Sequence, residues 1–176
     1  MGSAVKPAIM LVPIGAVPGE VHNWLADALP PILHCACSLA PALPHPTLAW
    51  NSRRQQYLAD MTLALVTVGH ATHALAIADL DLYVPELNFV FGLADWAAAR
   101  AIIALPRLRQ DFYGLPEDMV LFRKRVVKEA VHELGHTFGL GHCRDRRCVM
   151  TFSNSLSDTD YKGPGFCPKC QKQAQN

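Results

Sequence analysis

Three histidines and a glutamate stand close together in HELGHTFGLGHC, residues 132–143, and their spacing suits a metal ion. His132 and His136 are four positions apart, so on a helix they project from one face, where two neutral imidazoles can chelate a single ion. Gly139 can adopt the left-handed conformation that ends a helix, which lets His142 reach the same ion from outside the helix. Three histidine ligands leave a fourth position for water, and an open position distinguishes a catalytic zinc from a structural one.

Glu133 follows the first histidine and lies at the edge of the same helical face, where it can accept a proton from a metal-bound water without binding the ion. Zinc lowers the pKa of such a water from about 15.7 to roughly 7 and polarises a carbonyl group. With Glu133 as general base and then as proton donor to the leaving amine, the predicted reaction is hydrolysis of a peptide bond in a peptide or protein substrate. The short pattern H-E-x-x-H occurs by chance, but its extension to H-E-x-x-H-x-x-G-x-x-H favours the zinc site.

Four cysteines form a second candidate metal site just downstream, spaced as Cys143-x4-Cys148 and Cys167-x2-Cys170. Because the sequence carries no convincing export signal, reduced thiolates that bind a metal are favoured over disulfides. Four thiolates close the coordination sphere of zinc, so this site would be structural. The sequence therefore predicts two zinc ions, one catalytic and one structural.

The cysteine site would also order its surroundings. The linking segment 151–166 is polar and rich in turn-forming residues, so it has little to bury and should depend on the metal for its order. Because Cys143 is adjacent to His142, the structural zinc should also fix the position of the third histidine.

Two hypotheses in which the protein is not an enzyme remain open. The histidine site could be vestigial or empty in a zinc-binding protein, or the cysteines could form a zinc-ribbon interaction module whose basic segment 144–147 faces a phosphate backbone. A net charge of +1 and the lack of interleaved aromatic residues weigh against a nucleic-acid partner. The presence of Glu133 favours the enzyme.

The composition indicates one globular domain. The chain has 176 residues and is 51% hydrophobic, which suffices for a buried core, and no apolar run approaches the ~18 residues of a membrane span. The apolar segment 8–17 follows Lys6 as a signal peptide would, but Pro13 and Gly15 interrupt it, and a buried strand explains it more simply. The segment MGSAVK, residues 1–6, has lysine where N-myristoylation needs Ser or Thr. We therefore predict a soluble, cytoplasmic protein without a membrane partner, and we expect a monomer.

Hydrophobic periodicity and the positions of proline and glycine predict a mixed α/β (α+β) fold. The clearest element is a helix over 114–139, which begins with Pro116 and two acidic residues and carries apolar residues near the 3.6-residue period. We expect a twisted mixed β-sheet packed on this helix. Residues 1–139 would form the sheet-and-helix part of a single domain, 1–176, and residues 140–176 its C-terminal part. The other expected elements are strands at 8–14, 31–39, 73–84, 87–95 and 97–108, helices at 17–29 and 53–66, and an extended connection at 41–47.

At these residues the sequence resembles the metzincin metallopeptidases, whose pattern is HExxHxxGxxH followed by a methionine turn, for which Met150 in CVMTF is the candidate. More narrowly, HELGHTFGLGHC, the C-x4-C-x-M run and CPKC look like the archaemetzincins, in which the third histidine leads into a cysteine and four cysteines hold a second zinc. The resemblance is dense over residues 111–170. It implies a metzincin-like fold with a cleft over the active-site helix, a small zinc-stapled C-terminal segment, and zinc-dependent peptidase activity of an aminopeptidase-like kind.

One position departs from the better-known metzincins. Phe152 stands where some subgroups place a tyrosine, two residues after the methionine, so no phenol from that position can stabilise the oxyanion. Tyr161, His70 and a backbone amide are the alternatives. The segment LNFVFGLAD, residues 87–95, is expected to supply the edge strand that lines the cleft.

Overall fold

The computed structural model describes residues 7–175, so the MGSAVK segment and residue 176 lie outside the described part of the chain. Among the described residues, no helix combines the length and the apolar character needed to cross a membrane. The elements follow one another as β1 (Ala8–Ile14), α1 (Gly19–Leu33), β2 (Ala36–Leu39), η1 (Thr47–Ala49), β3 (Trp50–Asn51), β4 (Gln56–Leu58), α2 (Ala59–Leu63), β5 (His73–Ala78), β6 (Leu82–Tyr83), β7 (Gly92–Asp95), β8 (Arg100–Ala104), η2 (Pro106–Leu108), η3 (Asp111–Tyr113), α3 (Met119–Thr137), α4 (Leu156–Tyr161) and α5 (Pro168–Ala174).

Five strands form the main sheet in the order β2-β1-β5-β8-β7. The first four run parallel, whereas β7 pairs antiparallel with β8 and forms one edge. Successive residues of a strand point to opposite faces, so Leu75 and Ile77 of β5 pack on one side of the sheet and Ala74, Ala76 and Ala78 on the other. Because both faces are apolar, other elements must cover both of them.

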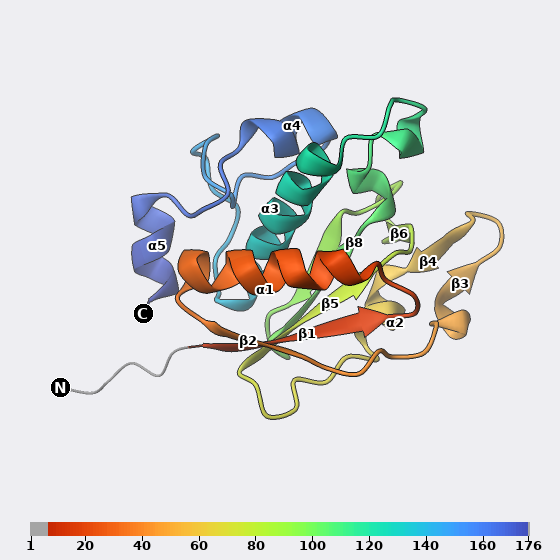
Figure 1. Ribbon diagram of the computed structural model, residues 1–176, viewed down its shortest axis with the longest axis horizontal. Coiled ribbons are helices and arrows are strands. Elements are labelled where there is room, and N and C mark those ends of the chain that lie inside the picture. Colours follow the sequence, from red (N-terminus) through yellow and green to blue (C-terminus); the bar gives the residue numbers. More distant parts are fainter. Residues whose placement is uncertain (1–6, 176) are drawn as a thin grey trace.

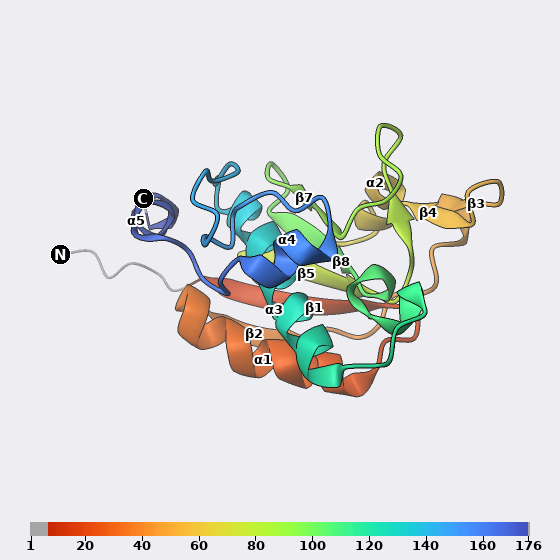
Figure 2. The ribbon, with the colours of Figure 1, turned by 90° about the horizontal axis from the view of Figure 1, so that it is seen from above.

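Helices α1 and α3 cover one face, and a smaller unit covers the other. α1 and α3 pack against each other and on the face that carries Ile9, Leu75 and Ile103 (Figure 1). Helix α2 and the three-stranded sheet β3-β4-β6 lie on the opposite side, with Val12 and Ala76 beneath them (Figure 2). The predicted α/β class, with a twisted mixed sheet packed on the histidine-bearing helix, is confirmed.

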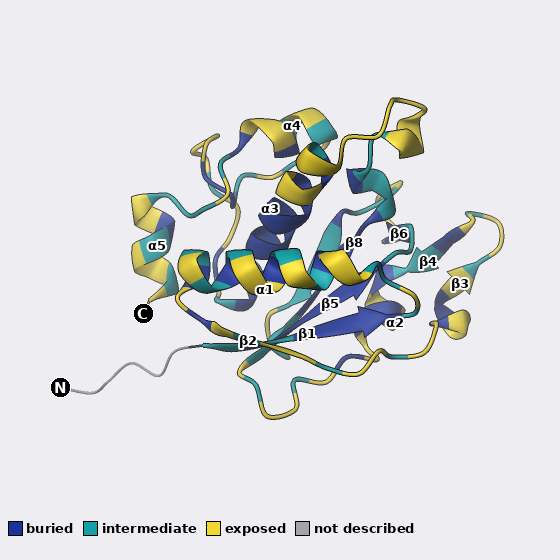
Figure 3. Cartoon of the chain, viewed as in Figure 1, coloured by how far each residue is buried: buried dark blue, intermediate teal, exposed yellow. Residues whose placement is uncertain are grey.

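Helix α3 begins later than predicted and ends where predicted. It starts at Met119 rather than at residue 114, because Gly114 is left-handed with φ 74° and the extended Asp118 caps the helix by accepting a hydrogen bond from the Leu121 amide at 2.8 Å. Gly139, with φ 81°, follows its last turn. Met119 and Val120 at its start are exposed, whereas every residue from Arg125 to Gly135 is buried (Figure 3).

The predicted helix over 53–66 is wrong in its first half. Gln55 has a positive φ of 56°, and the next three residues form β4, which pairs parallel with β6. Gln56 is buried and donates hydrogen bonds to Asp81 and to the Asn88 carbonyl. These long-range partners override the helical pattern, and only α2 is helical.

Other boundaries also differ from the sequence expectation. The strand expected over 73–84 is two strands, β5 and β6, in different sheets, and only Gly92–Asp95 of the strand expected over 87–95 is a strand. α1 runs on through Pro30 and Pro31 to the buried Leu33 and stops at the left-handed His34, so β2 is shorter than the strand expected over 31–39. Strand β8 ends at Ala104, and a 3-10 turn replaces the rest of the strand expected over 97–108.

Candidate metal centres and active-site cleft

The three histidines of the motif converge at the C-terminal end of α3. One ring nitrogen of each lies within 4.8 Å of the corresponding nitrogens of the other two, and the Nε2 atoms of His132 and His136 are 3.1 Å apart. The turn at Gly139 brings His142 back toward the helix. A tetrahedral zinc with Zn–N bonds of about 2.0–2.1 Å holds its ligand atoms roughly 3.3 Å apart. The histidine set therefore fits a zinc ion.

Backbone carbonyls orient two of the rings. Nδ1 of His132 donates to the Val149 carbonyl and Nδ1 of His136 to the Leu140 carbonyl, each at 2.8 Å. Because a carbonyl oxygen only accepts, both rings carry their proton on Nδ1 and present a free lone pair on Nε2. Hydrogen bonds of this kind fix the tautomer and the orientation of histidine ligands in metal sites.

Burial favours the neutral form of all three imidazoles. Desolvation lowers the pKa of His132 to about 4, and it also lowers the pKa values of His136 and His142. At neutral pH a cation therefore meets unprotonated nitrogens and displaces no proton.

The four cysteines come together as a second set. Their Sγ atoms lie within 4.8 Å of one another, and those of Cys143 and Cys167 are 3.9 Å apart. Zn–S bonds of about 2.3 Å place sulfurs roughly 3.8 Å apart in a tetrahedral site. The amides of Asp145 and Cys167 point at the sulfurs of Cys143 and Cys148, at 3.4 and 3.3 Å, and stabilise thiolate charge there. With Cys170 the set offers four sulfurs and fits a closed zinc site.

One short segment joins the two sets. Cys143 follows His142 directly, and its amide donates to the Met150 carbonyl at 3.0 Å. Val149, whose carbonyl orients His132, belongs to the same segment. The position of the cysteine set therefore influences where two of the three histidines, His132 and His142, lie.

Met150 packs directly against α3. Its side chain is fully buried, and a Cβ added at Gly135 would collide with its sulfur. The glycine of HELGH thus lets the methionine lie against the helix between His132 and His136.

Glu133 points from α3 toward the edge strand β7. A Cβ added at Gly92 would lie 2.6 Å from the Glu133 Cγ and 2.7 Å from its Oε1, so only glycine lets the strand approach this closely. Burial raises the pKa of Glu133 well above its ordinary value, and the nearby Glu129 carboxylate raises it further. A cation held by the histidines favours the ionised form again.

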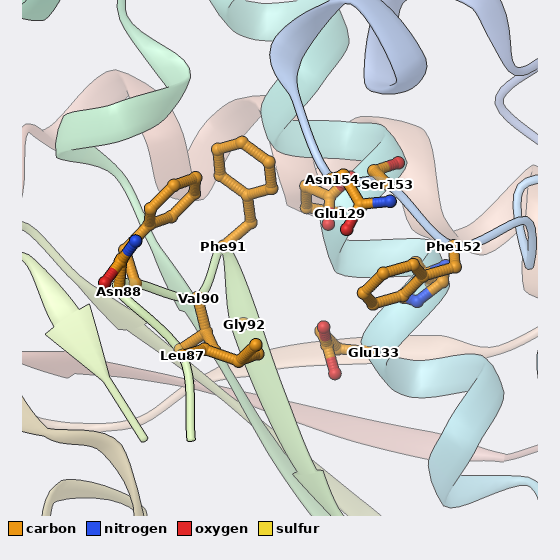
Figure 4. A pocket seen from close by; sticks show the side chains of 12 residues that line it. Leu87, Asn88, Val90, Phe91, Gly92, Glu129, Glu133, Phe152, Ser153 and Asn154 are labelled. Carbon is orange, nitrogen blue, oxygen red and sulfur yellow. The ribbon is translucent and has the colours of Figure 1, made fainter. Parts of the chain in front are cut away.

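Two hollows meet at Glu133. The smaller has a volume of about 220 Å³ and the larger about 650 Å³. Figure 4 shows Glu133 between Gly92 and Phe152 in the smaller one. The residues that line both hollows are Leu87, Val90, Gly92, His132, Glu133 and Phe152.

The chain matches a known family over most of its length. Residues 52–176 match the family model of Peptidase family M54. The archaemetzincin of Methanocaldococcus jannaschii is 40% identical over 169 residues, which cover 96% of this chain and 93% of the relative. The chain belongs to the archaemetzincins, peptidase family M54. It is a zinc metallopeptidase, and the family assignment predicted from the motif is confirmed.

Two solved structures are similar to this archaemetzincin-family chain. The crystal structure of the Archaeoglobus fulgidus archaemetzincin complexed with malonate has a TM-score of 0.84 and 36% identity, covering 94% of this chain and 99% of that one. A zinc-dependent peptidase from Methanocorpusculum labreanum has a TM-score of 0.85 and 30% identity, with the same coverage of both chains.

Sequence reasoning missed a buried ion pair beside the histidines of this archaemetzincin-family protein. Lys162 Nζ lies 3.0 Å from Glu129 Oε1 and 3.5 Å from His132 Nδ1, and the two side chains of the pair are 1% and 3% exposed. Glu129 could have been found, because it lies one helical turn before Glu133. Nothing in the sequence around Lys162 points to the site.

The same part of α3 holds α4 in place. Lys128 Nζ donates to the Thr159 and Asp160 carbonyls, both at 2.9 Å, and Arg125 makes two hydrogen bonds of 2.7 Å with the Asp160 carboxylate. Thr159 and Lys162 are fully buried. Segment 151–166 buries little besides Thr159 and Lys162, as expected, but this polar network gives it an attachment to the helix that the sequence did not predict.

Two of the three alternatives for the oxyanion lie away from the cleft lining. Tyr161 packs with Arg146 and Arg147, whose guanidinium carbons are 4.8 and 4.5 Å from its ring centre, and His70 lies in the turn before β5. Neither lines either hollow. A backbone amide is the remaining alternative.

Proposed function

We propose that this zinc metallopeptidase hydrolyses peptide bonds at a catalytic zinc held by His132, His136 and His142, with Glu133 as general base. A second, structural zinc is held by Cys143, Cys148, Cys167 and Cys170. The observation that carries the proposal is the convergence of three neutral imidazoles, two of them oriented by backbone carbonyls, beside a buried carboxylate at the junction of two hollows.

The chemistry follows from the position of Glu133. When bound, zinc lowers the pKa of a water to about 7 and polarises the substrate carbonyl. The Glu133 carboxylate takes the proton of the attacking water and then gives it to the nitrogen of the leaving amine. Strand β7 ends the sheet next to this carboxylate, and an extended peptide can pair with such an edge. This pairing would place the peptide bond across Glu133, with substrate residues in both hollows.

Replacing Glu133 by glutamine tests the general-base role. We expect Glu133→Gln to keep both zinc ions and to lose about 10²- to 10⁴-fold in kcat, because the amide cannot accept the proton. Turnover is measured on a mixed peptide library, with zinc content measured by elemental analysis. The matched control is Glu20→Gln, at an exposed position of α1, which should retain full activity. Wild-type turnover in Glu133→Gln would exclude the assignment.

A preference for the amino-terminal bond is the narrower proposal. It rests on the resemblance to the archaemetzincins, whereas the two hollows offer room on both sides of Glu133. The test compares the same peptides with free and with acetylated amino termini. Cleavage of free peptides alone supports the aminopeptidase-like activity, and equal cleavage of both forms contradicts it.

A further inference from the structure

The smaller hollow has apolar walls and a polar end. Phe89 and Phe91 stand edge to face, with ring centres 5.1 Å apart, and form one wall. Glu129, Ser153 and Asn154 gather away from Glu133 (Figure 4). A volume of about 220 Å³ corresponds to roughly seven waters, which is enough for one long side chain. Because His132 and Glu133 also line this hollow, that side chain would belong to a residue that flanks the cleaved bond.

The polar end holds a carboxylate, which can only accept hydrogen bonds, and one buried hydroxyl that the protein leaves unpaired. Glu129 lines this end, and its Oε1 accepts from Lys162 at 3.0 Å and from Thr159 at 3.2 Å. The Ser153 hydroxyl oxygen is buried and has no hydrogen-bond partner within residues 7–175. Buried polar atoms without a partner cost free energy, which a ligand group of the right kind recovers.

The charge at this end is already balanced. Lys162 is fully buried behind Glu129 and neutralises it, so the polar end of the hollow carries no net negative charge. A carboxylate from a substrate would face the Glu129 carboxylate, and both groups can only accept. An apolar side chain would leave the Ser153 hydroxyl unpaired, and sites with buried polar groups reject such ligands.

We propose that the smaller hollow selects a long substrate side chain whose end donates hydrogen bonds, as in glutamine or lysine. This inference rests on the proposed peptidase function and adds the substrate class. The larger hollow is lined mainly by apolar groups, among them Leu93 and Trp96. The preference for a donor therefore applies to only one of the two residues that flank the cleaved bond.

The test uses alanine-based heptapeptides that carry glutamine, lysine, norleucine or glutamate at each position in turn. For the zinc-loaded enzyme we expect kcat/KM to be at least about tenfold higher for glutamine and lysine than for norleucine, and lowest for glutamate. The effect should appear on one side of the cleaved bond, which mass spectrometry of the products identifies.

Variants of the polar end assign the preference to this hollow. Ser153→Ala should reduce the glutamine-to-norleucine ratio of kcat/KM severalfold, whereas Ser157→Ala, an exposed serine of α4, should leave it unchanged. The double variant Glu129→Gln with Lys162→Met keeps the pair neutral and should reduce the preference for lysine more than that for glutamine.

Binding to an inactive variant separates this inference from the peptidase proposal. The same peptides are titrated against zinc-loaded Glu133→Gln, whose Kd values report the hollow without turnover. If the wild type cleaves no peptide but the Kd order holds, the peptidase proposal fails and the selectivity stands. Equal Kd and kcat/KM for glutamine and norleucine at every position, or no binding of any peptide, would overturn the inference.

Discussion

Single glycines bring the neighbours of the candidate zinc ligands into contact with α3. Gly92 lets β7 lie against Glu133, and Gly135 lets Met150 lie against the helix. Two backbone carbonyls then fix the tautomers of His132 and His136. The geometry of the site therefore depends on these glycines and main-chain carbonyl oxygens as much as on the residues that would bind zinc.

The depressed pKa of His132 predicts how the stability of the metal-free protein depends on pH. The pKa is about 4 in the folded chain and 6.5 in the unfolded one, so between these values only the unfolded state binds the proton. The free energy of unfolding should therefore fall as the pH is lowered from 6.5 to 4, by about 3 kcal/mol from this histidine. Denaturant unfolding after chelation of zinc measures this pH dependence of the free energy of unfolding.

The ionisation of Glu133 changes the free energy of unfolding with pH in the opposite direction, so its contribution must be removed from the measurement. Its raised pKa makes the folded state bind the extra proton, so its contribution to stability falls as the pH rises above 4.5. The measurement therefore uses Glu133→Gln as the background, with and without His132→Gln. If both proteins show the same pH dependence, His132 is not its source.

At the scale of elements, α3 is buried from Arg125 to Gly135 because α1, the sheet and α4 pack around it. It packs on α1 and the sheet, lines the cleft and holds α4. Its buried polar residues face the cleft and α4, whereas Arg123 and Lys124 near its start are exposed. Lys128 binds carbonyls at the end of α4 that have no partner within that helix, and Arg125 binds the Asp160 carboxylate. This explains why apolar periodicity describes only part of the helix.

The Glu129–Lys162 pair should behave as a single unit. Lys162→Met leaves the Glu129 carboxylate buried without its cation, which we expect to cost about 3–5 kcal/mol of the free energy of unfolding. Adding Glu129→Gln should restore most of that loss, since the buried charge is gone. Urea unfolding of the zinc-loaded proteins measures both. A double variant as unstable as the single one would show that the loss does not come from the unpaired charge.

At the scale of the whole molecule, two separate attachments hold the C-terminal part. The cysteine set joins 143–148 to α5, and the polar network joins α4 to α3. In the proposal made above, only the first attachment depends on a metal. Removal of that metal should loosen the chain on either side of α4 and leave α4 docked.

Cys148→Ser tests this division. We expect the variant to hold one zinc ion instead of two, and to bind that zinc less tightly because Val149 orients His132. Limited proteolysis should cut within 143–150 and after Gly163 but spare α4. Elemental analysis and mass spectrometry of the fragments measure these effects.

The control is Cys37→Ser, whose sulfur lies outside both ligand sets and should leave two zinc ions bound. Unchanged proteolysis and full zinc retention in Cys148→Ser would contradict the coupling of the two centres. Complete digestion of α4 would show instead that the polar network cannot hold it without the metal.

The sequence by itself determined the histidine arrangement, because that arrangement is local. Residues four apart on a helix share a face, and Gly139 ends the helix wherever the rest of the chain lies. The spacing of the cysteines and the family resemblance came from the same dense stretch of the chain. The central sheet strands also followed from short apolar runs.

Only the tertiary structure decided the features that depend on distant partners. Lys162 reaches Glu129 because α4 docks on α3, and Gln56 lies in a strand because Asp81 and Asn88 bind its side chain. The smaller hollow owes its polar end to the meeting of α3 with the chain at Ser153. Contacts between residues far apart in sequence leave no periodic signal, so they were decided by packing alone.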